Sequence, residues 1–316
     1  MELPPRLVDL AGIRTLFPTA VHEQNGRINH LNYSEDGNLL ITSDDNDCMT
    51  VYDIQTGTLN RTINSKKYGV NLVHFVRGTK DVISASTKVD NTIRYLSLSN
   101  NQYLRYFVGH SKKVVTLCMN PTEEMFLSGA LDNTVRLWDL RVSTCQGVMN
   151  LPSRPIVAFD PDGLIFAAGI NSETIKLYDL KTFDKGPFAT FNVKPDDEFN
   201  FEWTNMTFSP DGQTILISTN GEMLRVVNSF TGKLQATLIG HENKEKLSLN
   251  GCFSPDSKFV FCGGSDGQLT AWDRDTGEVV QQYKTNDNDS IEQCLFNHKY
   301  YILATGSKKL SLWNPE

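Results

Sequence analysis

The chain has 316 residues, of which 39% are hydrophobic, 10% aromatic and 21% charged. This composition is that of a folded globular protein and excludes extended disorder. The formal net charge of −7 argues against wholesale binding to nucleic acid or to an anionic membrane.

The first ten residues, MELPPRLVDL, lack the basic region and the apolar run of a secretory signal peptide. No apolar window is long enough to predict a membrane span, which needs about 18 residues. The six cysteines have no C-x-x-C spacing, which favours reduced core residues over disulfides or zinc ligands. These features predict an intracellular protein.

The rest of the chain is predicted to consist of repeats. A bulky residue that closes an apolar run recurs at Tyr33, Phe75, Met119, Phe159, Phe208, Phe253 and Phe296. A second mark, with Trp-Asp as its fullest form, recurs at Tyr52, Leu96, Trp138, Tyr178, Val227, Trp272 and Trp313. Turn sequences such as SPDG follow the first mark, and alternating runs such as TVRLW lead into the second. A period of about 40 to 45 residues with Trp-Asp endings is typical of WD-repeat propellers, in which each repeat forms one four-stranded blade.

Seven repeats predict an all-β, seven-bladed WD-repeat β-propeller that occupies residues 1–316 as a single domain. The last repeat reaches only its third strand at LWNPE. The segment IRTLF, Ile13 to Phe17, has strand composition and precedes the first repeat. We therefore expect this segment to pair with the last blade, which would close the ring and cover an open sheet edge.

Repeat three carries a set of polar residues at His110, Ser128, Asp132 and Trp138. In the WD-repeat proteins that it resembles, the Asp holds the His, which bonds the Ser and through it the Trp. Such a connected network fixes one arrangement of the buried groups. Although a Ser-His-Asp hydrolase triad uses the same residue types, the blade pattern accounts for all of them. Repeat six has Cys262 in place of the serine.

Nothing in the sequence predicts catalytic, cofactor-binding or metal-binding residues. The histidines His22, His30, His74 and His298 share no metal-ligand spacing and are expected to be isolated. The innermost strands, such as VVTLCM and IVAF, are largely apolar. We therefore expect no enzyme activity and no cofactor.

The charge is distributed unevenly. Residues 61–113 contain ten basic and two acidic residues, which leaves −15 for the rest of the chain. Five lysines of this region are predicted in loops on one face of the ring: Lys66, Lys67, Lys88, Lys112 and Lys113. They suit an acidic or phosphorylated partner segment, and a merely solvated surface is the alternative. The segment KPDDEFNFEW, Lys194 to Trp203, is either a site for a basic segment or, as we favour, an overlong loop.

One stretch of the sequence contains residues that the blade pattern alone does not require. In FDKGPFATF, Phe183 to Phe191, the repeat explains a corner at Lys185 to Pro187 between two strands, but it does not require the whole sequence. This stretch, with SKKYGV, NTIRYLSL, RYFVGH and LISTNG, resembles the WD repeat-containing protein 82 family. The resemblance covers essentially the whole chain.

The resemblance implies a nuclear, non-catalytic scaffold subunit of the COMPASS-type complex, in which a Set-domain subunit methylates lysine four of a histone tail. It also implies a link to the serine-five-phosphorylated tail of RNA polymerase II, and membership of a protein phosphatase one or cleavage-polyadenylation assembly. The five lysines are candidates for the phosphorylated ligand by charge and loop position alone. We expect a monomeric ring within hetero-complexes, with no membrane or direct nucleic-acid partner. Alternatives are a generic WD adaptor, such as a ubiquitin-ligase substrate receptor, and more remotely a propeller hydrolase.

Overall fold

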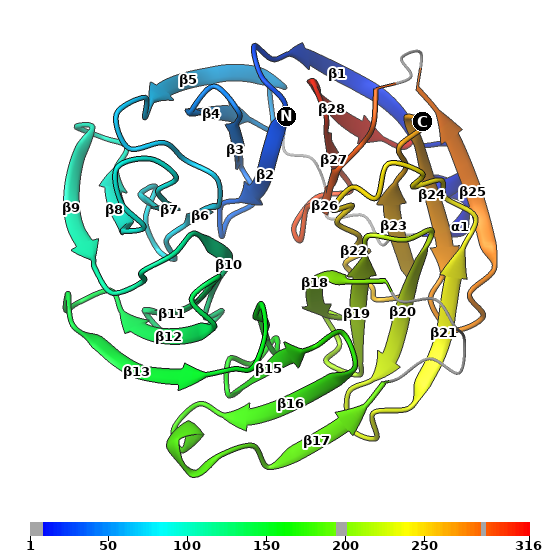
Figure 1. The fold of residues 1–316 in the computed structure, drawn as a ribbon. Helices are drawn as coiled ribbons and strands as arrows, with labels where there is room; N and C mark the ends of the chain where they lie inside the picture. Colours follow the sequence, from blue (N-terminus) through cyan, green and yellow to red (C-terminus); the bar gives the residue numbers. More distant parts are fainter. Residues whose placement is uncertain (1–8, 194–200, 286–288) are drawn as a thin grey trace.

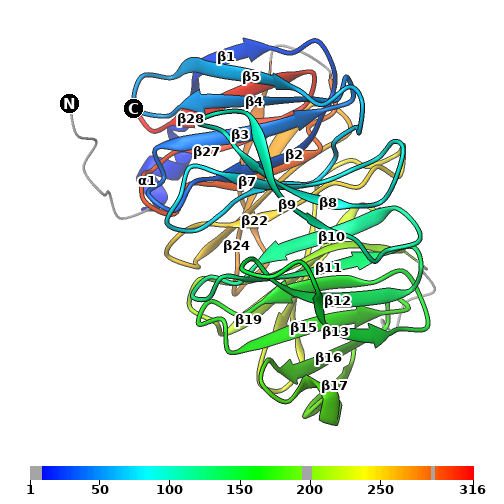
Figure 2. The same cartoon turned by 90° about the vertical axis from the view of Figure 1, so that its left-hand side faces the viewer.

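The computed structural model describes residues 9–193, 201–285 and 289–316. In these ranges the strands form seven antiparallel sheets of four strands each. Figure 1 shows the sheets as blades around a ring, and Figure 2 shows the same ring from the side. The predicted seven-bladed, all-β propeller is confirmed.

Each blade is numbered here from its inner to its outer strand. Blade one contains β2 (Ile28–Tyr33), β3 (Leu39–Asp44), β4 (Cys48–Asp53) and β5 (Thr58–Asn64). Blade two contains β6 (Val73–Phe75), β7 (Val82–Ala85), β8 (Ile93–Ser97) and β9 (Gln102–Phe107). Blade three contains β10 (Val114–Met119), β11 (Met125–Ala130), β12 (Thr134–Asp139) and β13 (Cys145–Asn150).

The second half of the ring follows the same plan. Blade four contains β14 (Ile156–Phe159), β15 (Ile165–Ile170), β16 (Thr174–Asp179) and β17 (Ala189–Asn192), with the 3₁₀ turn η1 (Phe183–Lys185) before β17. Blade five contains β18 (Trp203–Phe208), β19 (Thr214–Thr219), β20 (Met223–Asn228) and β21 (Leu234–Ile239). Blade six contains β22 (Cys252–Phe253), β23 (Phe259–Gly263), β24 (Gln268–Asp273) and β25 (Val279–Lys284). Blade seven contains β26 (Gln293–Phe296), β27 (Leu303–Gly306), β28 (Lys309–Asn314) and β1 (Phe17–Glu23).

The predicted turn sequences form the corners between inner strands. At the β18–β19 corner, SPDG, the Ser209 hydroxyl donates to Asp211 at 2.5 Å and accepts from the Thr214 backbone N–H at 3.0 Å. Gly212 follows with φ +69, which glycine adopts without strain. Residue chemistry thus fixes where the chain reverses.

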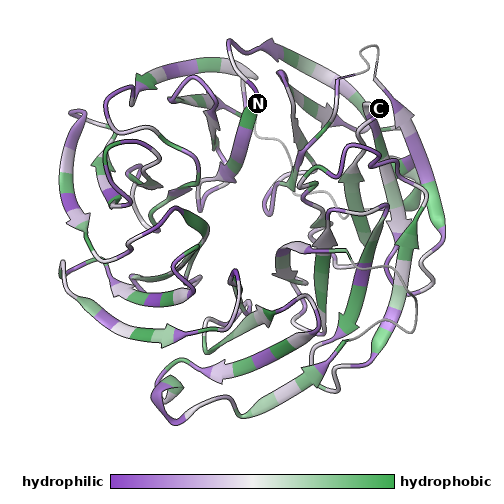
Figure 3. Ribbon diagram, in the orientation of Figure 1, coloured by the Kyte–Doolittle hydropathy of each residue, from purple (hydrophilic) through white to green (hydrophobic). Residues whose placement is uncertain are grey.

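The hydrophobic core lies between neighbouring blades. One cluster joins Ile83 and Ala85 of blade two to Phe126 and Trp138 of blade three, all fully buried. Figure 3 shows hydrophobic residues concentrated on inner and middle strands, whereas polar and apolar residues alternate along many outer ones. Because each sheet covers its faces by stacking on its neighbours, the ring is stable only when it closes.

The closing strand differs from the sequence prediction. The order β1-β28-β27-β26 shows that the N-terminal segment does complete blade seven. The strand is Phe17–Glu23, however, and not Ile13 to Phe17. Most of β1 is exposed, so it carries no strong apolar alternation that would mark it in the sequence.

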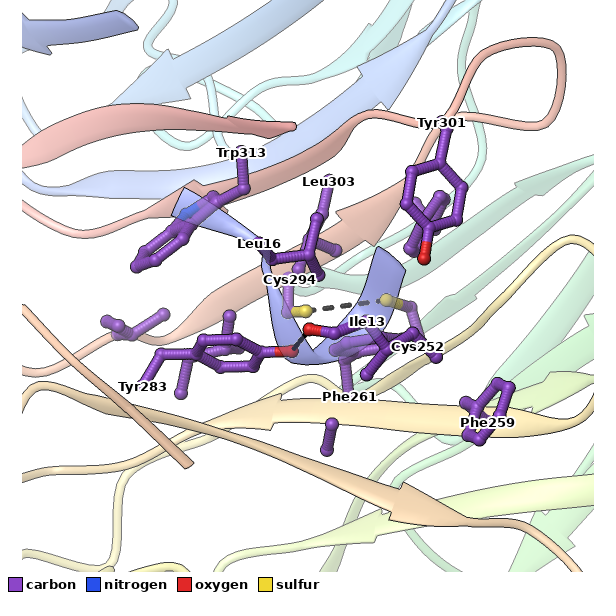
Figure 4. Close-up of a cluster of buried hydrophobic side chains, with 14 residues drawn as sticks. Ile13, Leu16, Cys252, Phe259, Phe261, Tyr283, Cys294, Tyr301, Leu303 and Trp313 are labelled. Atoms are coloured by element: carbon purple, nitrogen blue, oxygen red, sulfur yellow. Dashed lines mark hydrogen bonds between the residues drawn. The ribbon is translucent and has the colours of Figure 1, made fainter. Parts of the chain in front are cut away.

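Ile13 and Arg14 of the predicted strand instead belong to helix α1 (Leu10–Arg14). Its cap is Asp9, whose carboxylate accepts from the Gly12 N–H at 2.8 Å. Ile13 and Leu16, which lie three residues apart, are buried among side chains of blades six and seven (Figure 4). The Tyr283 hydroxyl of blade six donates to the backbone carbonyl of Ile13. The helix therefore fills the seam beside the strand that closes the ring.

Within the described ranges, no helix has the length and apolar character needed to cross a membrane.

Candidate partner-binding face

The five candidate lysines lie in three connections of blades one to three. Lys66 and Lys67 follow β5, Lys88 lies between β7 and β8, and Lys112 and Lys113 precede β10. Since strands alternate in direction within a blade, the connection between the second and third strands opens on the same face as the connection to the next blade. All five lysines are exposed. We call this surface the lysine face.

Hydrogen bonds tie the first of these connections to the β3–β4 turn of blade one and to the second connection. The Ser65 N–H donates to the backbone carbonyl of Asp47 at 2.8 Å, and the Lys88 N–H donates to the carbonyl of Tyr68 at 2.8 Å. Gly69 has φ +71, and a Cβ there would lie 2.0 Å from the Thr87 hydroxyl. Only glycine permits this close approach. The lysines of blade two thus project from ordered loops.

The lysines differ in how far protein groups balance their charge. The Lys88 ammonium forms an ion pair with the carboxylate of Asp47. Lys66, Lys67, Lys112 and Lys113 have no ion pair with any residue that the structure describes. These four are therefore the better candidates for binding an anion.

An arginine and three tyrosines lie beside the lysines. Buried Arg94 donates to both oxygens of Asp90, at 2.9 and 2.7 Å, and also bonds Ser86. These bonds lower the pKa of the Asp90 carboxyl. The Arg94 guanidinium lies 3.8 Å from the centre of the Tyr68 ring, and about 6 Å from the rings of Tyr103 and Tyr106.

Sequence reasoning missed this cluster because its members come from a loop and two strands. The only local signal is Asp90 followed four residues later by Arg94. Exposed apolar residues adjoin it in sequence, with Val89 78% and Val108 72% exposed. The lysine face therefore presents apolar surface as well as positive charge.

In blade three, the four predicted network residues are joined by hydrogen bonds. Burial opposes ionisation of Asp132, but bonds from Thr134, Ser111 and His110 outweigh it and lower the pKa of this carboxyl to about 2. Asp132 is thus an acceptor, so Nδ1 of His110 donates to it at 3.1 Å. Burial lowers the pKa of His110, so its Nε2 carries no proton and accepts from Ser128 at 2.7 Å. Ser128 in turn accepts from Trp138 Nε1 at 2.8 Å.

Blade six departs from this arrangement at the position of Cys262. Trp272 Nε1 donates to the Ile239 carbonyl of blade five at 2.7 Å. Burial lowers the pKa of His241 to about 4. Trp272 thus bonds the neighbouring blade, whereas Trp138 joins the serine–histidine network of blade three.

The expectation that the histidines are isolated is wrong for two of them. His30 on β2 and His74 on β6 are neighbours on adjacent inner strands, with ring centres 4.8 Å apart. Nδ1 of His30 donates to the Val73 carbonyl at 3.0 Å. In sequence they lie in different repeats, so only the alignment of inner strands brings them together. In the described part of the chain, no group of three or more His, Cys, Asp or Glu side chains could hold a metal ion.

Most of the acidic segment Lys194 to Trp203 falls outside the described residues. The prediction made for it therefore stays a prediction.

The fold and the repeat marks define a WD-repeat propeller. The family described as "WD domain, G-beta repeat" matches residues 15–53, 101–139 and 232–273. These ranges include the second mark of blades one, three and six, where Tyr52, Trp138 and Trp272 are buried.

Comparison with known proteins narrows this class. The chain is 49% identical to WD repeat-containing protein 82 of Drosophila melanogaster, over 93% of the chain and 92% of that protein. It is 34% identical to "COMPASS component SWD2" of Saccharomyces cerevisiae, over 98% and 96%. It is 37% identical to "Set1 complex component swd2" of Schizosaccharomyces pombe, over 75% and 68%. The chain belongs to the WD repeat-containing protein 82 family.

Proposed function

We propose that this protein is a non-catalytic scaffold subunit of a nuclear, Set1-type histone lysine methyltransferase complex. The observation that carries the proposal is similarity along almost the entire length of a yeast protein named as a COMPASS component. A fission-yeast relative named for the Set1 complex supports it independently. A rigid ring with two faces of connecting loops suits the simultaneous binding of several partner segments.

We further propose that the lysine face binds a phosphorylated segment, with the serine-five-phosphorylated RNA polymerase II tail as the expected ligand. Four lysines that form no ion pair with any described residue supply charge for hydrogen bonds to phosphate oxygens. Loops that are already tied together lose little conformational freedom on binding. Phosphatase one or cleavage-polyadenylation subunits are proposed as further partners of the ring.

The proposal is tested by purification from nuclear extract with the tagged protein as bait. We expect to recover a Set-domain methyltransferase subunit together with phosphatase one or polyadenylation-factor subunits. Recovery of ubiquitin-ligase subunits in their place would contradict the proposal and favour a substrate receptor.

The lysine face is tested separately by titrating the protein into a fluorescent polymerase-tail peptide, with and without phosphate on serine five. Changing Lys66, Lys67, Lys112 and Lys113 to Glu should weaken binding of the phosphorylated peptide at least about tenfold, since each lysine lost removes about one charge-assisted contact. The matched control changes four exposed lysines of the opposite face to Glu: Lys181, Lys185, Lys258 and Lys299. Equal binding by both variants would eliminate the lysine face as the site, whereas the methyltransferase proposal rests on the purification.

A further inference from the structure

We infer that the face opposite the lysines carries a second docking groove, between blades four and five, for a partner segment with a large apolar side chain next to a lysine or arginine. The groove is bounded by the turns β14–β15, β18–β19 and β20–β21 together with β17, the outer strand of blade four. These turns are first-to-second and third-to-fourth strand connections, so they open away from the lysine face. The inference therefore goes beyond the proposed function and does not depend on it.

The groove has the size and lining of a binding site. Its cavity measures about 420 Å³, within the range that accommodates small ligands or a few side chains. Six large apolar side chains line it: Ile165, Leu177, Phe188, Phe191, Phe208 and Phe230. A second cavity of about 530 Å³ shares Phe191 and extends along the end of β17 toward Leu234. The two cavities have Phe191 in common, and the lining of the second includes one lysine, Lys233.

Two aromatic side chains of the groove remain unusually exposed. Phe188 is 58% and Phe230 75% exposed. Phe230 is nevertheless held by an ordered turn, because the Asn228 side chain accepts from its N–H at 3.1 Å. Gly232, with φ +70, packs so closely that a Cβ there would lie 2.3 Å from the Phe191 ring. Exposed aromatic rings on fixed elements are typical of interaction surfaces.

The charged residues that line the main cavity are all aspartates, namely Asp160, Asp162 and Asp211. Asp211 is already paired with Arg274 at 2.7 Å, and Asp160 accepts from the Ile165 N–H at 2.9 Å. The Asp162 carboxylate has no hydrogen bond or ion pair among the residues that the structure describes. An apolar floor with an acidic rim complements a segment that carries both an apolar and a basic side chain, and it repels an acidic one.

The groove also explains residues of FDKGPFATF, Phe183 to Phe191, that the blade pattern alone does not require. Phe183 packs under blade three, where a Cβ on Gly147 would lie 2.0 Å from its ring. Gly186, at φ +94, turns the chain after η1. Phe188 and Phe191 then line the groove. One of the three phenylalanines thus serves the scaffold, and two form the proposed site.

The test selects ligands from a phage-displayed library of random dodecapeptides with the intact protein. We expect enriched peptides to carry Phe, Trp or Leu within a few positions of Arg or Lys. Enriched peptides, synthesised with a fluorescent label, should bind Phe188→Ser and Phe230→Ser at least tenfold more weakly than the wild type. Asp162→Lys should weaken them to a similar extent, whereas binding to Asp162→Asn should fall less.

The matched control is Ile239→Ser, because Ile239 is 59% exposed on β21 but does not line the groove. It should bind like the wild type, and all variants should retain the wild-type melting temperature. Failure to enrich any peptide, enrichment of acidic peptides, or equal binding by the groove variants would overturn the inference. So would a concentration-dependent dimer that Phe230→Ser abolishes, because a second copy of the chain would then occupy the groove.

Discussion

At the scale of single residues, the serine of blade three connects two buried aromatic rings, those of His110 and Trp138. Ser128 is fully buried and bonds both His110 and Trp138. The hydrogen bonds run in one direction, from the indole through the hydroxyl and the imidazole to the Asp132 carboxylate. Because every member is satisfied, the network favours a single arrangement of the blade.

Changing Ser128 to Ala should lower the free energy of unfolding by about 1 to 3 kcal/mol, because it leaves two buried polar groups without this partner. Urea denaturation followed by tryptophan fluorescence measures the change. Ser111→Ala is the control, since Ser111 is exposed and contributes its backbone N–H to the network. Equal stability of the two variants would show that the network does not stabilise the blade.

The histidine pair on the inner strands predicts a pH dependence of stability. Burial lowers the pKa of His30 to about 4 and that of His74 well below its usual value. Between pH 6.5 and about 4 the unfolded chain binds more protons than the folded one, so the free energy of unfolding falls as the pH falls through this window. His30→Asn, which keeps a donor for the Val73 carbonyl, should make the urea midpoint less sensitive to pH.

Exposed His298 supplies the control for this experiment, and His298→Asn should keep the wild-type pH dependence. An unchanged slope in His30→Asn would exclude His30 as its source. The stability that the ionised Asp132 carboxylate contributes is lost only at lower pH, because its pKa of about 2 places that titration below about pH 4.

At the scale of elements, the N-terminal segment closes the ring in two ways. Strand β1 pairs with β28 from Phe17↔Asn314 to Glu23↔Lys309, which covers an otherwise open edge. Helix α1 inserts Ile13 into the cluster formed by blades six and seven, where it is fully buried. The closure therefore combines strand pairing with a hydrophobic plug.

Deleting residues 1–23 should lower the melting temperature and broaden the transition, because blade seven loses its outer strand and its seam with blade six. Ile13→Ala tests the plug alone and should cost about 2 to 5 kcal/mol, as expected for a buried isoleucine. Differential scanning calorimetry measures both. Leu10→Ala, at a helix position that is 44% exposed, should change stability by less than about 0.5 kcal/mol. A deletion with the wild-type transition would contradict the role of this segment in closure.

The sequence predicted the elements that have a local signal. The SPDG-type turns and the Trp-Asp marks located the blades, because the turn sequences recur in several units and a buried residue marks the third strand of every unit. It misplaced the closing strand, since β1 is mostly exposed and an apolar run as short as the one from Ile13 to Phe17 does not distinguish a strand from a helix. The Arg94 cluster, the histidine pair and the groove were not predictable in this way, because each joins residues that meet only when neighbouring strands or blades are in position.

At the scale of the whole molecule, the two faces of the ring carry different candidate binding sites. One face collects exposed lysines on loops of blades one to three. The opposite face has an apolar groove with an acidic rim between blades four and five. Because the connections alternate between the two faces, two partner segments of opposite charge could bind the same ring without competing.

Amide hydrogen exchange gives the most direct test of the claim that a rigid ring docks partners through its loops. The free protein is compared with the same protein in the proposed methyltransferase complex, because exchange reports local protection along the whole backbone. We predict slower exchange in connecting loops of one or both faces on assembly, with the inner strands of all seven blades equally protected in both states. Unchanged loops, or a protection change spread through the inner strands, would contradict the account.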